Sequence, residues 1–286
     1  MKENIFLILG GDERSLYLGE YLEKQKLQVC YYAFSETNCF TSLHEAINEA
    51  QYIILPLPFT KDRMTLNAPA FEEKVEIKDI ITLLEKEHIV FGGQLPESFK
   101  EELKQKEIKY YDYFLLEELA IFNAIPTAEG VVEILIKNLP ITVHSMKCAI
   151  LGYGRVSKVL AHTLKALGAD VTIFARKEKD FADAYTKLYN VATFKSLRHK
   201  EYKFDALINT VPEKVLGKDE LKNISSGCLL LEIASAPFGI DFQAAKEFAF
   251  DVIKANSLPG KVAPKTAGEI IGRSILPIIK KQGVVL

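Results

Sequence analysis

Short apolar runs alternate with longer, partly polar stretches along most of the chain. The apolar runs have the length of strands, and the stretches between them have the length of helices. The expected strands cover residues 4–9, 28–34, 52–55, 89–91 and 108–111 in the first half, and residues 148–151, 171–174, 206–209, 229–233 and 252–254 in the second. Short strands separated by helices predict mostly parallel sheets that are covered on both faces. The predicted fold class is therefore α/β, with two Rossmann-like doubly wound domains linked by helices.

The chain has 286 residues, which is enough for two domains of ordinary size. We expect an N-terminal substrate-side domain over residues 1–125 and a dinucleotide-binding domain over residues 141–256. Two helices in tandem, residues 114–125 and 127–139, are predicted around Pro126, because proline suits the first position of a helix. The linker helix 127–139 and a last helix over residues 265–282 are expected to pack on the first domain.

The charge pattern excludes several classes of partner. The formal net charge is -2 and no basic run is long enough to follow a phosphate backbone, so nucleic acid and membrane surfaces are not expected partners. No uninterrupted apolar run approaches the roughly 18 residues of a membrane span, and no export leader is recognised, which favours the cytoplasm. The four cysteines have neither metal-knuckle nor redox-pair spacing, so no metal site is predicted.

A glycine turn opens the second domain. The segment Gly152-Tyr153-Gly154-Arg155-Val156-Ser157 follows an apolar strand and begins a helix. Such a turn lets the backbone approach a pyrophosphate, which then binds the free amides of the helix N-terminus. Residues 152–156 are therefore predicted to bind a nicotinamide dinucleotide. Ser157 stands where glycine or alanine is usual, and a ligand-free βα turn is the alternative interpretation.

The end of the next strand indicates which dinucleotide is bound. An NAD-specific domain usually places a carboxylate there for the ribose 2′-hydroxyl, whereas this chain has Ala175, Arg176 and Lys177. A guanidinium can pair with a 2′-phosphate, so we expect NADP; a solvated loop charge is the alternative. Two later strand ends are expected to border the same cofactor, and they supply Thr210, Val211, Pro212, Ala234 and Ser235.

The strand ends of the first domain supply candidate substrate ligands. Arg14 and the amides near Gly11 suit a carboxylate, although Asp12 has an equally good interpretation as the N-cap of the next helix. The remaining substrate-binding candidates are Asp12 itself, Pro58, Gly93, Gln94 and Thr127. Thr127 is expected in a first helical turn.

Four segments resemble a known family, the dipicolinate synthase A subunits of spore-forming bacteria. They are GGDER at residues 10–14, PTAEG at 126–130, GYGRV at 152–156 and LPGKVAPKTAG at 258–268. The resemblance covers essentially the whole chain; Ser157, where the family more often has glycine, departs from it. It implies NADP-dependent oxidation, of the CH–CH type, of a dihydrodipicolinate-level intermediate from the lysine pathway, or of its 4-hydroxytetrahydro form, to pyridine-2,6-dicarboxylate during sporulation. It also implies a partner, the flavoprotein-like B subunit, together with homo-oligomers and a place in the mother-cell cytoplasm.

The chemistry implied by the resemblance needs cations for a small dicarboxylate and a group that moves a proton. Glu129 and Lys261 are the catalytic candidates, and Glu129 is the proposed acid or base. An ordinary loop lysine is the alternative interpretation of Lys261. Two other functions stay open: an NAD(P)-dependent dehydrogenase of 2-hydroxy or 2-oxo acids, and a non-catalytic nucleotide-binding partner of a flavoprotein. The first usually needs a histidine paired with a carboxylate, and the five histidines show no such pattern.

Overall fold

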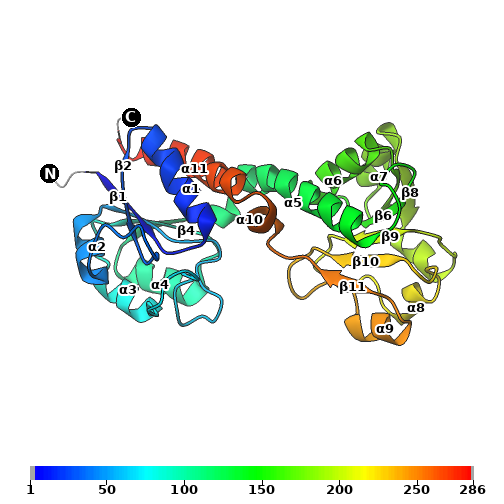
Figure 1. Ribbon diagram of the computed structural model, residues 1–286, viewed down its shortest axis with the longest axis horizontal. Coiled ribbons are helices and arrows are strands. Elements are labelled where there is room, and N and C mark those ends of the chain that lie inside the picture. The colour runs from blue at the N-terminus through cyan, green and yellow to red at the C-terminus, as the bar shows by residue number, and fades with distance from the viewer. Residues whose placement is uncertain (1–3, 285–286) are drawn as a thin grey trace. The chain divides into compact units, whose positions relative to one another are not determined.

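Two compact α/β units make up the structure, a computed structural model that describes residues 4–284 (Figure 1). The first unit contains residues 4–122 and 263–284, and the second contains residues 123–262. Residues 1–3, with which the predicted first domain begins, lie outside the described residues. The predicted α/β fold with two parallel sheets is confirmed.

The first unit is built on a five-stranded parallel sheet with the order β2-β1-β3-β4-β5. Its strands are β1 (Ile5–Leu9), β2 (Gln28–Tyr32), β3 (Tyr52–Ile54), β4 (Ile89–Gly92) and β5 (Lys109–Asp112). In the register of the sheet, Leu7 lies opposite Cys30 on one side and Ile53 on the other. The strand order reverses between β1 and β3, and ligands of such sheets bind beyond the carboxyl ends of the strands at that point.

Helices cover both faces of this sheet because alternate strand residues point to opposite sides. Leu7, Leu9 and Ile53 pack under α2 (Leu43–Glu49), α3 (Ile77–Leu83) and α4 (Glu97–Gln105). Phe6, Ile8 and Ile54 pack under α1 (Glu13–Lys24) and α11 (Pro264–Lys281).

The C-terminal helix α11 therefore completes the core of the first unit. It packs closely on α1, because a Cβ added at Gly268 would lie 2.4 Å from the carbonyl oxygen of Arg14.

The second unit contains a six-stranded parallel sheet with the order β11-β10-β9-β6-β7-β8, which is the Rossmann order. Its strands are β6 (Lys147–Leu151), β7 (Asp170–Ala175), β8 (Asn190–Thr193), β9 (Ala206–Asn209), β10 (Leu229–Glu232) and β11 (Val252–Lys254). Its other elements are α6 (Arg155–Ala166), α7 (Glu178–Thr186), α8 (Lys218–Leu221), α9 (Phe242–Glu247), α10 (Leu258–Val262) and the 3-10 helix η2 (Phe194–Arg198). The strand order reverses between β6 and β9. The short polar strand β8 was not expected from the sequence.

A single helix, α5 (Glu117–Asn138), replaces the two helices expected around Pro126. Proline removes one helical hydrogen bond, but the helix continues on both sides of it because both halves are packed. Ala128, Val131 and Leu135 are fully buried in the core of the second unit, so the linker segment packs there and not on the first domain. The short 3-10 helix η1 (Tyr113–Leu115) precedes α5.

By length and composition alone, α5 is also apolar enough to cross a membrane, with a mean hydropathy of 1.6 in its best window. Core helices share this property, and 39% of that window is buried inside the protein.

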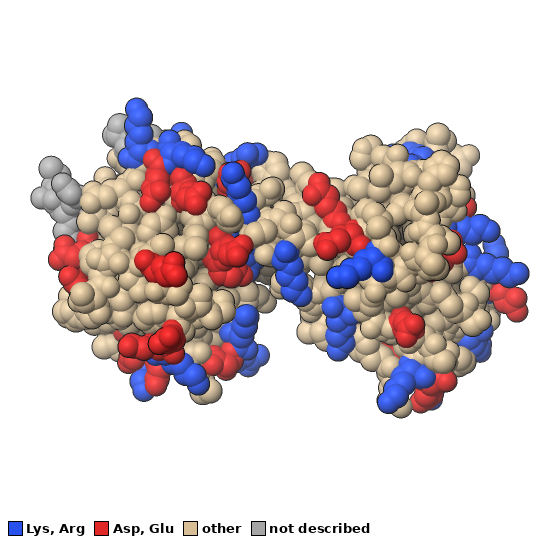
Figure 2. All heavy atoms as spheres, in the orientation of Figure 1, with Lys and Arg blue, Asp and Glu red and all other residues tan. Residues whose placement is uncertain are grey.

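Charged side chains of both signs are interspersed on the face drawn in Figure 2. On that face neither unit shows a broad patch of one sign, which agrees with the small net charge.

Candidate functional site

The glycine turn of the second unit lies at the point where its strand order reverses. Gly152 follows β6 with φ at 98°, a conformation that favours glycine, and an added Cβ would lie 2.7 Å from Thr210 Oγ1. Gly154 is the N-cap of α6, and a Cβ added there would meet nothing within 4 Å. The first turn of α6 carries no acidic residue. The result is an open helix N-terminus whose backbone amides face space that a phosphate can fill.

Ser157, the position that departs from the usual pattern, joins the two strands at the reversal point. Its side chain is fully buried, and its Oγ lies 2.7 Å from Thr210 Oγ1. The Thr210 hydroxyl donates to the carbonyl oxygen of Leu151 at 2.7 Å, so the Ser157 hydroxyl must donate to Thr210. Serine therefore fits here because it fastens the end of β9 to the nucleotide loop.

Tyr153 can offer a ligand only its backbone. Its ring is buried in the core, edge-on to Tyr189, with Lys158 Nζ 5.0 Å from the ring centroid. Burial raises the pKa of the Tyr153 hydroxyl, which has no hydrogen-bond partner among the described residues. Of the other predicted loop residues, Arg155 is exposed and Val156 is half-buried at the start of α6.

The residues expected to select NADP lie at the end of β7. Ala175 is buried, and Arg176 and Lys177 are exposed. Arg176 Nη1 donates to Glu213 Oε2 at 3.0 Å, and both side chains are more than 60% exposed (63% and 64%). Such an exposed pair contributes at most about 1 kcal/mol, so a competing phosphate can replace the carboxylate.

A buried carboxylate that the sequence analysis did not single out organises the two later loops. Glu232 ends β10, is fully buried, and accepts hydrogen bonds from the backbone amides of Ala234 (3.0 Å), Gly239 (2.9 Å) and Ile240 (2.9 Å). Asn209 Nδ2 donates to Glu232 Oε1 at 2.7 Å.

Asn209 extends this network to the loop after β9. It accepts from the amide of Val211 at 3.1 Å and donates to that residue's carbonyl oxygen at 2.9 Å. The carboxylate at the end of an otherwise apolar strand was the sequence signal for this network. Of the predicted cofactor residues in these loops, Val211 is half-buried, Ala234 is buried, and Pro212 and Ser235 are exposed.

The catalytic candidates lie on two segments of the second unit that touch. A Cβ added at Gly130 would lie 3.2 Å from side-chain atoms of Leu258 and Val262, so the middle of α5 packs tightly on α10. Glu129 and Lys261, the neighbours of these contact residues, are both exposed.

Thr127 is not in a first turn, as expected, but well inside α5, where its hydroxyl donates to the carbonyl oxygen of Asn123 at 2.6 Å. The helix-terminus argument for residues 127–129 is therefore wrong.

In the first unit, Arg14 is largely satisfied by groups of the protein itself. Its Nε and Nη2 donate to the two carboxylate oxygens of Asp12 at 2.9 and 2.7 Å, and Nη2 also donates to the carbonyl oxygen of Leu57 at 2.5 Å. Asp12 also accepts from the backbone amide of Arg14, as the N-cap of α1. Arg14 thus ties the loop after β1 to the loop after β3.

The loops after β3 and β4 are bonded to each other. Gly93 donates to the carbonyl oxygen of Pro56 at 3.2 Å, and Phe59 donates to that of Gly93 at 2.8 Å. Gly93 is buried, and an added Cβ would lie 2.7 Å from Leu57 Cβ, so close packing explains this glycine. Gln94 is exposed with a left-handed φ of 62° and lies with half-buried Pro58 at the rim of one cavity.

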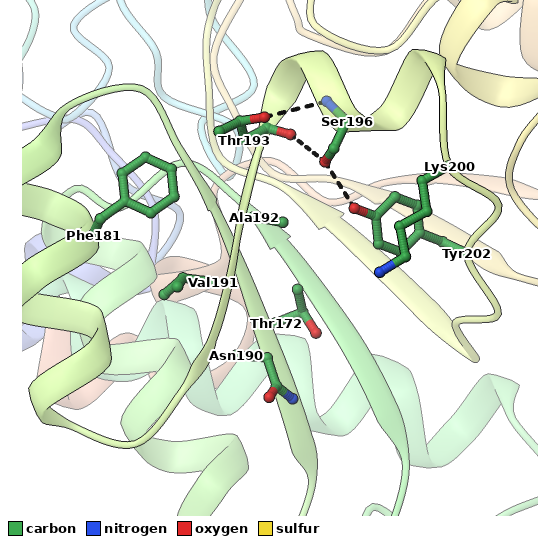
Figure 3. Close-up of a pocket in the computed structure, with 9 residues that line it drawn as sticks. All are labelled: Thr172, Phe181, Asn190, Val191, Ala192, Thr193, Ser196, Lys200 and Tyr202. Atoms are coloured by element: carbon green, nitrogen blue, oxygen red, sulfur yellow. Dashed lines mark hydrogen bonds between the residues drawn. The ribbon is translucent and has the colours of Figure 1, made fainter.

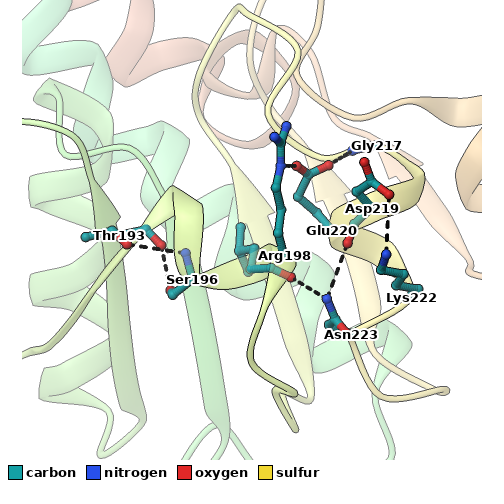
Figure 4. Close-up of polar contacts among 9 residues, drawn as sticks. Thr193, Ser196, Arg198, Gly217, Asp219, Glu220, Lys222 and Asn223 are labelled. Atoms are coloured by element: carbon teal, nitrogen blue, oxygen red, sulfur yellow. Dashed lines mark hydrogen bonds and ion pairs between the residues drawn. The ribbon is translucent and has the colours of Figure 1, made fainter.

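A second cavity, of about 650 Å³, lies at the β8 edge of the second unit (Figure 3). Ser196 lies 2.7 Å from the Tyr202 hydroxyl and donates to the carbonyl oxygen of Thr193 at 2.6 Å. Beside it, Arg198 Nε donates to Glu220 Oε1 at 2.5 Å, and Glu220 accepts from the amide of Gly217 at 2.9 Å (Figure 4). These contacts fasten η2 to neighbouring segments. None of the predicted cofactor residues lines this cavity.

The structure therefore brings the predicted residues together in two groups, one in each unit. The second unit holds the nucleotide-loop residues, the two later loops, and the segments of Glu129 and Lys261. The first unit holds Gly11, Asp12, Arg14, Pro58, Gly93 and Gln94. Within residues 4–284, no group of three or more His, Cys, Asp or Glu side chains could hold a metal ion.

A Rossmann sheet with an open glycine turn, in one chain with a second parallel-sheet unit, defines a dehydrogenase-like α/β protein. D-lactate dehydrogenase from Escherichia coli shares this fold, with a TM-score of 0.64, 10% identity, and 98% of each chain covered. The family model for the N-terminal domain of the dipicolinate synthase A subunit matches residues 5–114.

The dipicolinate synthase A subunit of Bacillus subtilis (strain 168) is 30% identical over 285 residues, covering 95% of this chain and 94% of the relative. The crystal structure of the dipicolinate synthase A chain from Bacillus subtilis matches with a TM-score of 0.87 and 27% identity, covering 98% of this chain and 97% of that one. The chain belongs to the family of dipicolinate synthase A subunits, which confirms the resemblance noted in the sequence.

Proposed function

We propose that this protein oxidises a dihydrodipicolinate-level intermediate, or its 4-hydroxytetrahydro form, to pyridine-2,6-dicarboxylate, with NADP as the oxidant. The observation that carries the proposal is the open glycine turn at the β6/β9 reversal point, found in a chain of the dipicolinate synthase A-chain family. As in the sequence analysis, sporulation and the mother-cell cytoplasm are the expected setting.

The residues present fit a dinucleotide. Gly154 leaves room above the N-terminus of α6, and the first turn of that helix has no carboxylate to repel a pyrophosphate. Gly152 brings the backbone against Thr210, so the wall of the site is tight where the chain passes from β6 to β9. Val211, Pro212, Ala234 and Ser235 stand in the loops held by Glu232, at the carboxyl ends of β9 and β10.

Arg176 supports NADP over NAD. No carboxylate stands at residues 175–177, and the exposed partner of Arg176, Glu213, is weakly bound. A 2′-phosphate carries more charge than Glu213 and offers more acceptor oxygens, so it should displace that carboxylate.

The reaction removes a hydride and a proton from the ring of the dihydro substrate, and the hydroxylated form also loses water. The bound nicotinamide accepts the hydride. Glu129 and Lys261 are our candidates for moving the proton and for holding substrate charge, because the packing of α5 on α10 keeps their segments adjacent. Arg14 has only the rest of its guanidinium to offer a carboxylate, so in this proposal it mainly shapes the loops of the first unit.

The relative from Bacillus subtilis is named as one lettered subunit of its synthase, which supports a complex with a second chain. We expect that partner to be the flavoprotein-like B subunit implied by the sequence resemblance. Turnover by the purified chain alone would identify it as the oxidase; turnover only with the second subunit would favour the nucleotide-binding partner instead. A 2-hydroxy acid dehydrogenase is disfavoured because, within the described residues, His144 precedes β6 and His162 lies within α6, away from the carboxyl ends of the strands.

The cofactor site is tested by adding a single methyl group at Gly154. Its φ of -88° suits alanine and its surroundings are open, so Gly154→Ala should unfold within about 0.5 kcal/mol of the parent. The same methyl should obstruct the pyrophosphate and weaken NADPH binding at least about tenfold, or 1.4 kcal/mol.

Gly217→Ala is the matched control for this experiment. Gly217 is also an extended N-cap in the second unit, with φ at -112° and only ordinary contacts for an added Cβ. NADPH affinity is measured by fluorescence titration, and stability by urea unfolding. Equal NADPH affinity of Gly154→Ala and the parent chain would place the cofactor elsewhere.

A further inference from the structure

The first unit contains a cavity of about 650 Å³ between the loop after β3, the loop after β4 and the start of α4. Its volume is within the range of small-molecule sites. Besides Pro58 and Gln94, its lining includes Thr60, Lys61, Arg63 and Ser98. The cavity lies at the carboxyl edge of the sheet, where ligands of parallel sheets bind.

Each wall of this cavity is fixed by a carboxylate that is used internally. Asp62 Oδ1 accepts from the amides of Met64 and Thr65 at 2.8 Å each, and Oδ2 accepts from the Thr65 hydroxyl at 2.7 Å. These bonds hold the pKa of Asp62 well below its usual range, so the turn that carries Lys61 and Arg63 keeps its shape over the ordinary pH range.

Asp112 fixes the opposite wall. It accepts from the amides of Gln94 and Leu95 at 3.0 and 3.1 Å. Gln94 is thereby held in its left-handed conformation at the rim.

The charge that remains in the cavity is positive. Within residues 4–284, neither Lys61 nor Arg63 forms an ion pair, and both side chains are exposed. The one acidic lining residue, Glu97, is paired with Lys100 at 2.9 Å. Lysine and arginine cations next to hydroxyl and amide groups are suited to bind carboxylates.

We infer that this cavity binds the carboxylates of a small dicarboxylate, with Lys61 and Arg63 supplying the charge. The inference rests on the proposed function, because it assigns the substrate of that reaction to the first unit. It also moves the main anion ligand from Arg14, which Asp12 already neutralises, to two cations without a carboxylate partner. Thr60, Gln94 and Ser98 line the same space and can donate further hydrogen bonds.

Calorimetric titration of the full chain with pyridine-2,6-dicarboxylate tests this site, with and without saturating NADP. Replacement of both cations, Lys61→Gln with Arg63→Gln, should weaken binding at least tenfold and leave NADPH affinity unchanged. The parent should prefer the dicarboxylate over pyridine-2-carboxylate, and the double variant should lose most of that preference. The matched control is Lys24→Gln with Lys104→Gln, which removes two exposed lysines from last helical turns of the same unit.

Dicarboxylate affinity of the double variant within twofold of the parent, or no saturable binding to the parent under either condition, would overturn the assignment. Lys61→Arg with Arg63→Lys should restore most of the affinity, which a merely structural role would not require. The two proposals fail separately. Loss of NADPH binding in Gly154→Ala with normal dicarboxylate binding would leave both standing, whereas turnover with an unchanged KM in the cation variant would remove only this site.

Discussion

Replacement of Glu232 by glutamine tests whether the buried carboxylate holds the loops of the nucleotide site. Its Oε1 accepts from Asn209 Nδ2 and the Ala234 amide, and its Oε2 accepts from the amides of Gly239 and Ile240. Glutamine turns one of these oxygens into a donor, so two of the four donors lose their acceptor in a fully buried place.

The expected loss of stability follows from these contacts. An unsatisfied buried donor costs about 1–3 kcal/mol, and breaking a buried charged network costs about 3–5 kcal/mol. We therefore expect Glu232→Gln to destabilise the second unit by about 3–5 kcal/mol. For a domain of this size that lowers Tm by about 10–15 °C.

Scanning calorimetry of the full chain measures this change, and fluorescence titration measures the accompanying fall in NADPH affinity. Glu213→Gln is the control, because Glu213 is 64% exposed and should cost no more than about 0.5 kcal/mol. A Glu232→Gln variant within 1 kcal/mol of the parent would refute the reasoning, since four such hydrogen bonds could not then hold the loops.

Three further results are expected. Arg176→Ala should reduce the preference for NADPH over NADH about tenfold in fluorescence titrations while NADH affinity stays unchanged, and an unaltered ratio would leave Arg176 as a surface charge. Glu129→Gln should abolish turnover and spare NADPH binding; near-normal kcat would remove Glu129 from the mechanism. Burial raises the pKa of Cys148 and Cys228 to about 12, so at pH 8 a thiol reagent should modify exposed Cys39 quickly and these two only after unfolding, whereas fast modification of all three would contradict their burial.

The sequence predicts the layers of the fold well because burial on both faces leaves a plain signal. Each wholly buried strand, such as Ala206–Asn209, shows as a short apolar run between polar segments. The glycine turn could also be located, because tight turns and close approach leave few alternatives to glycine at residue 152.

The missed features depend on contacts between residues that are distant in sequence. Pro126 usually begins or ends a helix, and only the packing of α5 on both sides of it shows why the helix continues. The strand β8 is short and half-exposed, so it lacks an apolar pattern. Ser157 fits poorly by sequence pattern alone, and its partner Thr210 becomes visible only in the fold.

The same limit applies to the substrate residues. Arg14 has the right chemistry for a carboxylate, but nothing in the sequence shows that Asp12 and Leu57 already use it. Lys61 and Arg63 resemble ordinary loop charges until the turn around Asp62 places them on one cavity.

The most direct test of the proposed function is a turnover assay with the purified chain, NADP and a freshly generated dihydrodipicolinate-level substrate, with and without the second subunit. NADPH and pyridine-2,6-dicarboxylate are quantified together, and Gly154→Ala serves as the inactive comparison. We predict equal amounts of the two products, formed faster with NADP than with NAD and lost in the variant. Formation of the dicarboxylate without any NADPH, or no turnover even with the second subunit present, would contradict the proposed function.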